Sequence, residues 1–226
     1  MPTLLALDAS TEACSCAVLH NGEVSEQFEL VPRQHTQRLL PMIEQLMAVA
    51  GLGFGDLDAI AFGKGPGSFT GLRIAAGVAQ GLAFAADRPV LPVSTLAAVA
   101  AQAGCAAGSA LVFACLDARI DEIYWGWYAV KDGQPQLLGN EHLCTPEAVP
   151  VALPILHATA LAAGNGLVYC ERLPPALTDR FTMLQPDVLP RSSHIIRLAA
   201  ALWRQGGAIA PEAVNPVYLR DKVTHN

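Results

Sequence analysis

The chain opens with apolar and alternating runs that predict three consecutive strands. "TLLALDAS" is an apolar run that ends in a polar turn, which is typical of a buried strand. "CSCAVLHNGEVSEQFEL" predicts two more strands joined at Asn21-Gly22, a dipeptide favoured in tight antiparallel hairpins. The first half of the chain is therefore expected to begin as a β-meander.

Helical spacing follows over residues 36–49, and Gly51 supplies a typical C-cap. Pro41 lies inside this pattern and indicates that the regular helix either starts there or kinks. A buried strand, "LDAIAFGKGPG", then leads into a helix over residues 68–86, followed by the strand "PVLPVS" and an alanine-rich helix over 95–103. The order β-β-β-α-β-α-β-α predicts a mixed sheet covered by helices.

The second half repeats this opening. "ALVFACLDARIDEIYWGWYAVKDGQPQLLG" predicts two strands and a Lys131-Asp132-Gly133 hairpin into a third, and Asp117 ends the first of them as Asp8 does in the first half. Two similar openings indicate a duplicated fold. Between residues 146 and 190 only "LVYC" is expected as a strand, and "HIIRLAAALWRQ" predicts a helix before an extended tail.

Composition narrows the class of protein. The chain is 52% hydrophobic and carries a net charge of −6, which argues against binding nucleic acid through its own phosphate contacts. The N-terminus does not resemble a signal peptide, and the apolar run of residues 74–86 is too short for a membrane span, so a soluble, cytoplasmic protein is expected. Cys14 and Cys16 share one face of a strand, where packing or a metal ligand pair are both conceivable.

"GKGPGSFTGLRIAAG", residues 63–77, is the most distinctive stretch, because a glycine-rich turn before a helix can bind an anion. It is not a Walker A motif, since Lys64 precedes the glycines. The functional hypothesis is a residual nucleotide or anion site, whose candidate residues are Asp8, Ser10, Thr11, Gly65, Gly67, Ser68 and Thr70. The alternative is that Ser68 caps the helix and the glycines allow the turn and close packing.

The sequence offers no catalytic constellation. The six histidines are scattered without ligand spacing, and no G-x-S-x-G elbow surrounds Ser68. A predicted strand carries four aromatic residues that alternate between its faces: Tyr124, Trp125, Trp127 and Tyr128. They are expected either to pack in the core or to stack on nucleic-acid bases. Neither a catalytic residue nor a metal site is expected.

Taken together, the motifs resemble one family over nearly the whole chain. They are "DAST" after the first strand, the "NG" hairpin, "HTQRLLPMI", "GKGPGSFTGLRI", "DARIDEIYWGWY" and "PVYLR". This set resembles the TsaB family of tRNA threonylcarbamoyladenosine biosynthesis proteins. The resemblance implies an α/β, two-lobed actin/Hsp70-like fold of the ASKHA type, with a mixed sheet and helices in each lobe. The expected lobes are an N-terminal lobe of residues 1–104 and a smaller C-terminal lobe of residues 105–226. The C-terminal helix or tail could pack back on the N-terminal lobe.

The resemblance also implies a function. The family is a degenerate relative of TsaD, the catalytic subunit, whose His-x-x-x-His pair falls here on Thr95 and Val99, neither of which binds a metal. The expected role is a non-catalytic pseudoenzyme or scaffold, required for threonylcarbamoyl transfer to the adenosine beside the anticodon of ANN-decoding tRNAs. The resemblance implies that the protein binds TsaD directly and contacts TsaE through the TsaB–TsaD complex. It would contact tRNA only indirectly, through that complex, and it would form a homodimer in the absence of TsaD.

The partner surface is expected on the two helices of the first lobe. Its candidate residues are Leu39, Leu40, Ile43, Met47, Leu72, Ala75, Ala76, Ala79 and Ala83, and a large charged residue at Ala76 or Ala79 would test it. The alternative is that both helices are buried within the monomer. No cofactor is firmly expected, although ATP or ADP at the complex interface stays open. The rival function is an independent actin-fold ATPase or small-molecule kinase that uses Asp8 and the glycine-rich turn.

Overall fold

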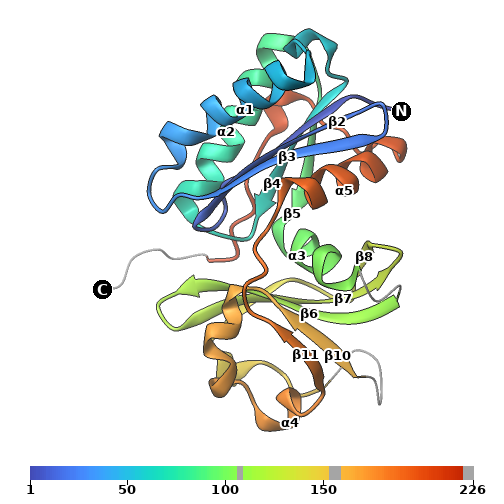
Figure 1. Ribbon diagram of the computed structural model, residues 1–226. Helices are drawn as coiled ribbons and strands as arrows, with labels where there is room; N and C mark the ends of the chain where they lie inside the picture. Colours follow the sequence, from blue (N-terminus) through green and yellow to red (C-terminus); the bar gives the residue numbers. More distant parts are fainter. Residues whose placement is uncertain (106–108, 153–158, 221–226) are drawn as a thin grey trace. The chain divides into compact units, whose positions relative to one another are not determined.

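A computed structural model describes residues 1–105, 109–152 and 159–220. The chain forms two compact units, each with its own core (Figure 1). The first unit contains Met1–Thr95 and Pro190–Val217, and the second contains Leu96–Leu189 with the segment from Tyr218 onward. The division falls between Thr95 and Leu96, at the start of the alanine-rich helix rather than at the expected residue 104, and the segment 190–217 belongs to the first unit.

The first unit is built on a five-stranded mixed sheet. The strand order is β3-β2-β1-β4-β5, in which β1, β2 and β3 are antiparallel and β4 and β5 are parallel to β1. The strands are β1 Leu4–Asp8, β2 Ala13–His20, β3 Glu23–Leu30, β4 Ala59–Gly65 and β5 Val90–Ser94. Asn21 and Gly22 both have positive φ in the β2–β3 turn, as this hairpin type requires.

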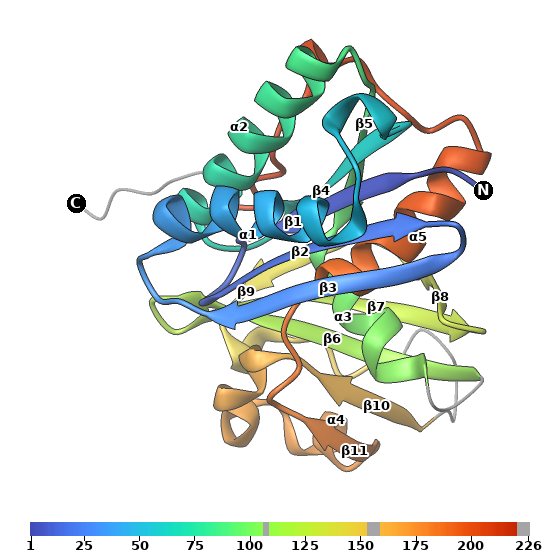
Figure 2. The same ribbon diagram turned by 45° about the horizontal axis from the view of Figure 1, so that its top comes forward.

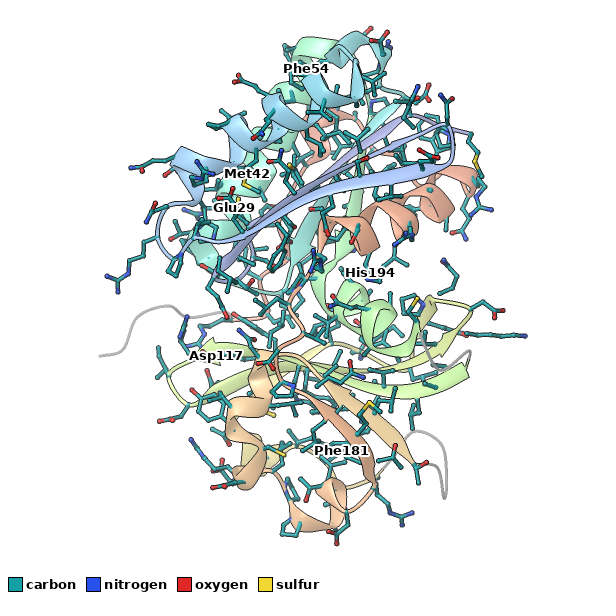
Figure 3. The ribbon with its side chains drawn as sticks, in the orientation of Figure 1. Glu29, Met42, Phe54, Asp117, Phe181 and His194 are labelled. Carbon is teal, nitrogen blue, oxygen red and sulfur yellow. The ribbon has the colours of Figure 1, made fainter. Side chains whose placement is uncertain are left out.

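Three helices cover the two faces of this sheet: α1 His35–Ala50, α2 Phe69–Ala86 and α5 Ser192–Arg204. α1 and α2 pack on the face that carries Cys14 and Cys16, which are buried and free, and Met42 lies between α1 and the sheet (Figure 3). α5 covers the opposite face, as Figure 2 shows. Since side chains alternate along a strand, Ser15 points to that face, where its hydroxyl accepts a hydrogen bond from the Ser192 backbone N–H at 3.1 Å.

The first two helices predicted for the first half are present. α1 begins six residues before Pro41, so the regular helix does not start at the proline. The helix predicted over residues 68–86 is confirmed as α2, which is 18 residues long and so extends beyond the apolar run of residues 74–86. By length and composition alone α2 is long and apolar enough to cross a membrane, a test that core helices also pass.

The second unit repeats the sheet of the first. Its order is β11-β10-β6-β7-β8, with β9 paired to β7, so β8-β7-β6-β10-β11 matches β3-β2-β1-β4-β5 in both sequence order and strand direction. The strands are β6 Ser109–Arg119, β7 Glu122–Lys131, β8 Gln134–Leu137, β9 His142–Cys144, β10 Ala160–Ala163 and β11 Phe181–Gln185. The predicted duplication is confirmed.

The side chains of β7 alternate between the two faces of the second sheet and pack into the hydrophobic core on each face. Tyr124 and Tyr128 pack toward α3 Thr95–Gly104, whereas Trp125 and Trp127 pack on the other face. That face is covered by short helices, namely η3 Pro146–Ala148, η4 Asn165–Arg172 and α4 Pro175–Thr178. All four aromatic side chains are buried, so core packing is confirmed for them and base stacking would need surface that they do not offer.

Candidate functional site

Asp8 occupies the end of β1 and is buried without a full set of partners. Its Oδ1 accepts hydrogen bonds from the Ser10 backbone N–H at 3.0 Å and from the Ser10 hydroxyl at 2.8 Å. Its Oδ2 is also buried and has no hydrogen-bond partner among the described residues. Burial raises the pKa of Asp8 to about 7, against the smaller lowering effect of the two Ser10 hydrogen bonds. Asp8 is therefore a titratable group inside the first core.

The glycine-rich loop packs directly on this turn. A Cβ at Gly63 would lie 1.9 Å from Asp8 Oδ2, one at Gly67 would lie 2.6 Å from the Ser10 carbonyl oxygen, and one at Gly71 would lie 1.8 Å from the Ala9 carbonyl oxygen. No side chain fits at such distances, so glycine is required at each position. The space between the loop and the β1–β2 turn is thus filled by the chain's own backbone.

Hydrogen bonds within the chain also engage the donors that an anion would need. The Ser68 backbone N–H donates to the Ser10 carbonyl at 2.7 Å, and the Ser68 hydroxyl accepts from the Gly71 N–H at 3.4 Å as the N-cap of α2. The Thr11 hydroxyl accepts from the Ala13 N–H at 3.2 Å. Of the two sequence interpretations, this geometry supports capping and close packing.

The remaining candidate anion residues lie around the same loop. Gly65 is buried with φ +112°, and a Cβ there would lie 2.7 Å from the Val217 carbonyl oxygen. Thr70 is exposed in the first turn of α2. The structure thus gathers all seven predicted residues along the β1–β2 turn and the glycine-rich loop, with Asp8 and Ser10 inside and Ser68 and Thr70 outside.

The second unit contains a counterpart of this loop that the sequence analysis missed. Gly164 has φ +112°, equal to that of Gly65, and a Cβ on it would lie 1.8 Å from the Cys115 carbonyl oxygen. Asn165 Oδ1 then accepts from the Asp117 N–H at 3.0 Å. "LVYC" was predicted as a strand, but it follows this turn and lies in η4, as the start of α2 follows the first loop. The repeated spacing of Gly65-x-Gly67 and Gly164-x-Gly166 is the sequence signal that could have revealed the two loops as counterparts.

The positions aligned with the histidine pair are core residues. Thr95 and Val99 are fully buried at the start of α3, and the Thr95 hydroxyl donates to the Pro66 carbonyl. Within residues 1–105, 109–152 and 159–220, no group of three or more His, Cys, Asp or Glu side chains is placed to hold a metal ion.

The candidate partner-binding residues lie mostly inside the first unit. Leu40, 42% exposed, is at the surface. The other eight are at most 6% exposed and belong to the core under α1 and α2: Leu39, Ile43, Met47, Leu72, Ala75, Ala76, Ala79 and Ala83. Helical spacing identified a real face of each helix, but it is the face that packs on the sheet. These eight residues therefore do not form a free surface.

The outer face of α2 presents a different set of small residues. Gly77 and Gly81 are exposed and one helical turn apart, and a Cβ on either would meet no described atom within 4 Å. Phe69 and Phe84, 41% and 70% exposed, lie toward the two ends of the helix, and the Arg73 guanidinium stacks on Phe69 at 3.9 Å. α1 lies beside α2 and carries two exposed apolar side chains of its own, Leu40 and Val49.

The topology and the paired loops define an α/β protein with a two-lobed, actin-like fold. In agreement, residues 24–179 match the family model described as TsaD, tRNA N6-adenosine threonylcarbamoyltransferase. The chain is 39% identical to the tRNA threonylcarbamoyladenosine biosynthesis protein TsaB of Haemophilus influenzae, over 98% of this chain and 95% of that protein. It is 38% identical to TsaB of Escherichia coli, over 97% and 95%.

A solved structure agrees with these relatives. The structure titled YeaZ from Pseudomonas aeruginosa is 48% identical, with a TM-score of 0.91 over 97% of this chain and all of that one. The chain belongs to the TsaB family of tRNA threonylcarbamoyladenosine biosynthesis proteins.

Proposed function

We propose that this protein is a non-catalytic accessory subunit that is required for threonylcarbamoyl transfer to the adenosine beside the anticodon of ANN-decoding tRNAs. It acts in a complex with TsaD and TsaE, and the tRNA is held mainly by the complex. Family membership supports the pathway. The observation that carries the non-catalytic role is the glycine-rich loop, whose interior is filled by the Ala9 and Ser10 backbone and whose Ser68 N–H is already bonded.

The outer face of α2 is the surface that we assign to TsaD. Close approach of two helices needs small residues at the point of contact, and Gly77 and Gly81 provide them on one face. Phe69 and Phe84 supply apolar area on either side, which a partner would remove from water. In the absence of TsaD the same face would pair two copies of this chain.

A reconstituted transfer reaction tests the proposal. It contains TsaD, TsaE, threonylcarbamoyl-adenylate, ATP and an ANN-decoding tRNA, with this protein present or omitted, and ATP hydrolysis by this protein alone is measured in parallel. We expect transfer to depend on the protein and the lone chain to hydrolyse no ATP. Transfer that proceeds equally well without it would contradict the proposal, and steady ATP turnover by the lone chain would favour the rival ATPase or kinase.

Replacing Gly77 with Arg is expected to separate partner binding from folding. The position is open, so the unfolding free energy should change by no more than about 1 kcal/mol, and the lost glycine even favours the helix. A long cation at the contact should weaken association with TsaD at least tenfold, as measured by isothermal titration calorimetry. Ala76 and Ala79 are unsuitable for this purpose because they are 6% and 0% exposed, and a charge there would disrupt the core.

Gly77→Ala is the matched control. It makes the same improvement in helix propensity but keeps the side chain small, so its affinity for TsaD should stay within about threefold of the original. If Gly77→Arg binds TsaD as tightly as Gly77→Ala does, the outer face of α2 is not the contact.

A further inference from the structure

The outer face of α5 carries positive charge only. The face that packs on the sheet is formed by the four buried residues of the helix: Ser192, Ile195, Ile196 and Ala199. Arg197 and Arg204 are exposed on the side away from the sheet, and two helical turns separate them by roughly 10 Å along the helix axis. No acidic residue lies between Asp187 and Glu212. In a chain with 20 acidic residues against 14 lysines and arginines, this face is a local reversal of charge.

Neither of these two arginines is neutralised by an ion pair within the described residues. The arginines that form ion pairs there are Arg38, Arg119, Arg172, Arg191 and Arg220. Arg197 Nη1 and Arg204 Nε donate instead to backbone carbonyl oxygens one turn earlier in α5, those of Ser193 at 3.4 Å and Ala200 at 3.1 Å. Because a guanidinium has five N–H donors, each arginine keeps further donors at the surface for a ligand.

The imidazole of His194, labelled in Figure 3, lies one turn before Arg197 and responds to the same charge. Burial lowers the pKa of His194, and the Arg197 guanidinium lowers this pKa further. Glu26 raises the pKa, and its ion-pair partner Arg191 lowers it. The effect of Arg197 is larger than that of Glu26. The positive charge at this end of the outer face is therefore not compensated by the nearest carboxylate.

The shape of the face narrows the class of anion that fits it. Arg197 and Arg204 stand on the convex surface of a helix, so they cannot enclose a small anion between them. An extended polyanion can meet both side chains at once, and a sugar–phosphate backbone presents charges repeatedly along its length. Arginine is well suited to phosphate, because its planar donors match the phosphate oxygens. The family of this chain takes part in tRNA modification, which makes tRNA the polyanion to consider.

We propose that the outer face of α5 contacts the sugar–phosphate backbone of tRNA through Arg197 and Arg204 when this protein is in complex with TsaD. The contact does not depend on nucleotide sequence, because phosphates carry no sequence information directly. The proposal rests on the proposed function: a chain with a net charge of −6 binds RNA poorly by itself, so the complex supplies the remaining contacts.

The salt dependence of tRNA binding by the complex with TsaD tests this contact. Binding is followed by fluorescence anisotropy between about 50 and about 200 mM salt. Arg197→Gln and Arg204→Gln should each reduce the slope of log affinity against log salt by about 1, and the double variant by about 2. The double variant should also bind tRNA at least about tenfold more weakly. None should shift Tm, because both positions are exposed and glutamine has nearly the helix propensity of arginine.

Two kinds of control separate this surface from charge in general. Arg197→Lys and Arg204→Lys keep the positive charge, so their salt slopes should match that of the original protein. Arg180→Gln removes an exposed arginine from the position before β11 and should leave the slope unchanged. If the α5 glutamine variants keep the original slope, or if Arg180→Gln lowers the slope as much as they do, α5 is not the contact.

Further outcomes would overturn the proposal in distinct ways. A loss of affinity confined to ANN-decoding tRNAs, with other tRNAs bound as before, would indicate base recognition instead of a backbone contact. Weaker association of the double variant with TsaD or TsaE, at an unchanged tRNA slope, would show that α5 binds an acidic protein surface. The proposed function is tested separately: transfer that proceeds without this protein contradicts the accessory role, whereas dependent transfer with unchanged slopes contradicts only the α5 contact.

Discussion

Replacing Gly71 with Ala should destabilise the first unit by more than about 4 kcal/mol, because the new methyl group would lie 1.8 Å from the Ala9 carbonyl oxygen. That oxygen belongs to backbone, which cannot rotate away as a side chain can. Either α2 must move off the sheet or the β1–β2 turn must open, and both movements would disturb the buried Asp8. Urea unfolding followed by circular dichroism measures the change.

Gly77→Ala is the internal comparison for this prediction. It introduces the same methyl group into the same helix at a position where that group would meet nothing within 4 Å beyond the adjacent backbone of α2 itself, so it should stabilise α2 by about 1 kcal/mol. If the two substitutions shift the urea midpoint in the same direction, the tight packing between the glycine-rich loop and the β1–β2 turn is wrong.

Asp8→Asn should remove a pH dependence from the stability of the protein. The folded-state pKa of Asp8, about 7, lies above its ordinary value of 3.8, because burial disfavours the carboxylate. Between pH 4 and pH 7 the folded state therefore holds a proton that the unfolded state has released. The contribution of Asp8 is fully present below pH 4 and is lost as the pH rises through 7, with about 2 kcal/mol lost between pH 5 and pH 7.

Asparagine keeps the acceptor for the two Ser10 hydrogen bonds and does not ionise. The variant should resemble the original protein near pH 4, after allowance for its unpartnered amide, and become progressively more stable than it toward pH 8. The measurement is the unfolding free energy of both proteins in urea at pH 4, 5, 6, 7 and 8. A constant difference across this range would show that the pKa of Asp8 is not raised in the folded protein.

Asp87→Asn is the control for the loss of one carboxylate. Asp87 is exposed and has φ +52°, a conformation that asparagine adopts readily. Its replacement should leave the pH dependence of the original protein unchanged.

The sequence predicted most local structure because the signals for it are local. Asn21-Gly22 and Asp132-Gly133 specify hairpins by their own backbone preferences, and both hairpins are present. Gly51 ends α1 in left-handed conformation, and Ser68 caps α2. In each case the residue and the backbone geometry that it favours lie within a few positions of one another, so no distant contact is needed to decide the outcome.

The same reasoning was less successful from residue 146 onward. "LVYC" has the composition of a short strand, yet it follows Gly164, whose position against Cys115 fixes a turn before it. β11 pairs with β10 although its own residues 182–184 are exposed, so an alternating pattern is missing. Tertiary contacts decided this region, because its strands are short and carry weak periodicity of their own.

The sequence by itself determined the two β-meanders, the capped helices and the motifs that identify the family. Only the tertiary structure decided which side of α2 faces outward: Ala75 and Ala79 lie on the sheet, whereas Gly77 and Gly81 lie at the surface. The tertiary structure also shows that the backbone of Ala9 and Ser10 occupies the space beside the glycine-rich loop, which the sequence did not indicate. The physical reason is that small residues permit close approach from any neighbour, so their spacing marks where packing is tight but not which partner is packed there.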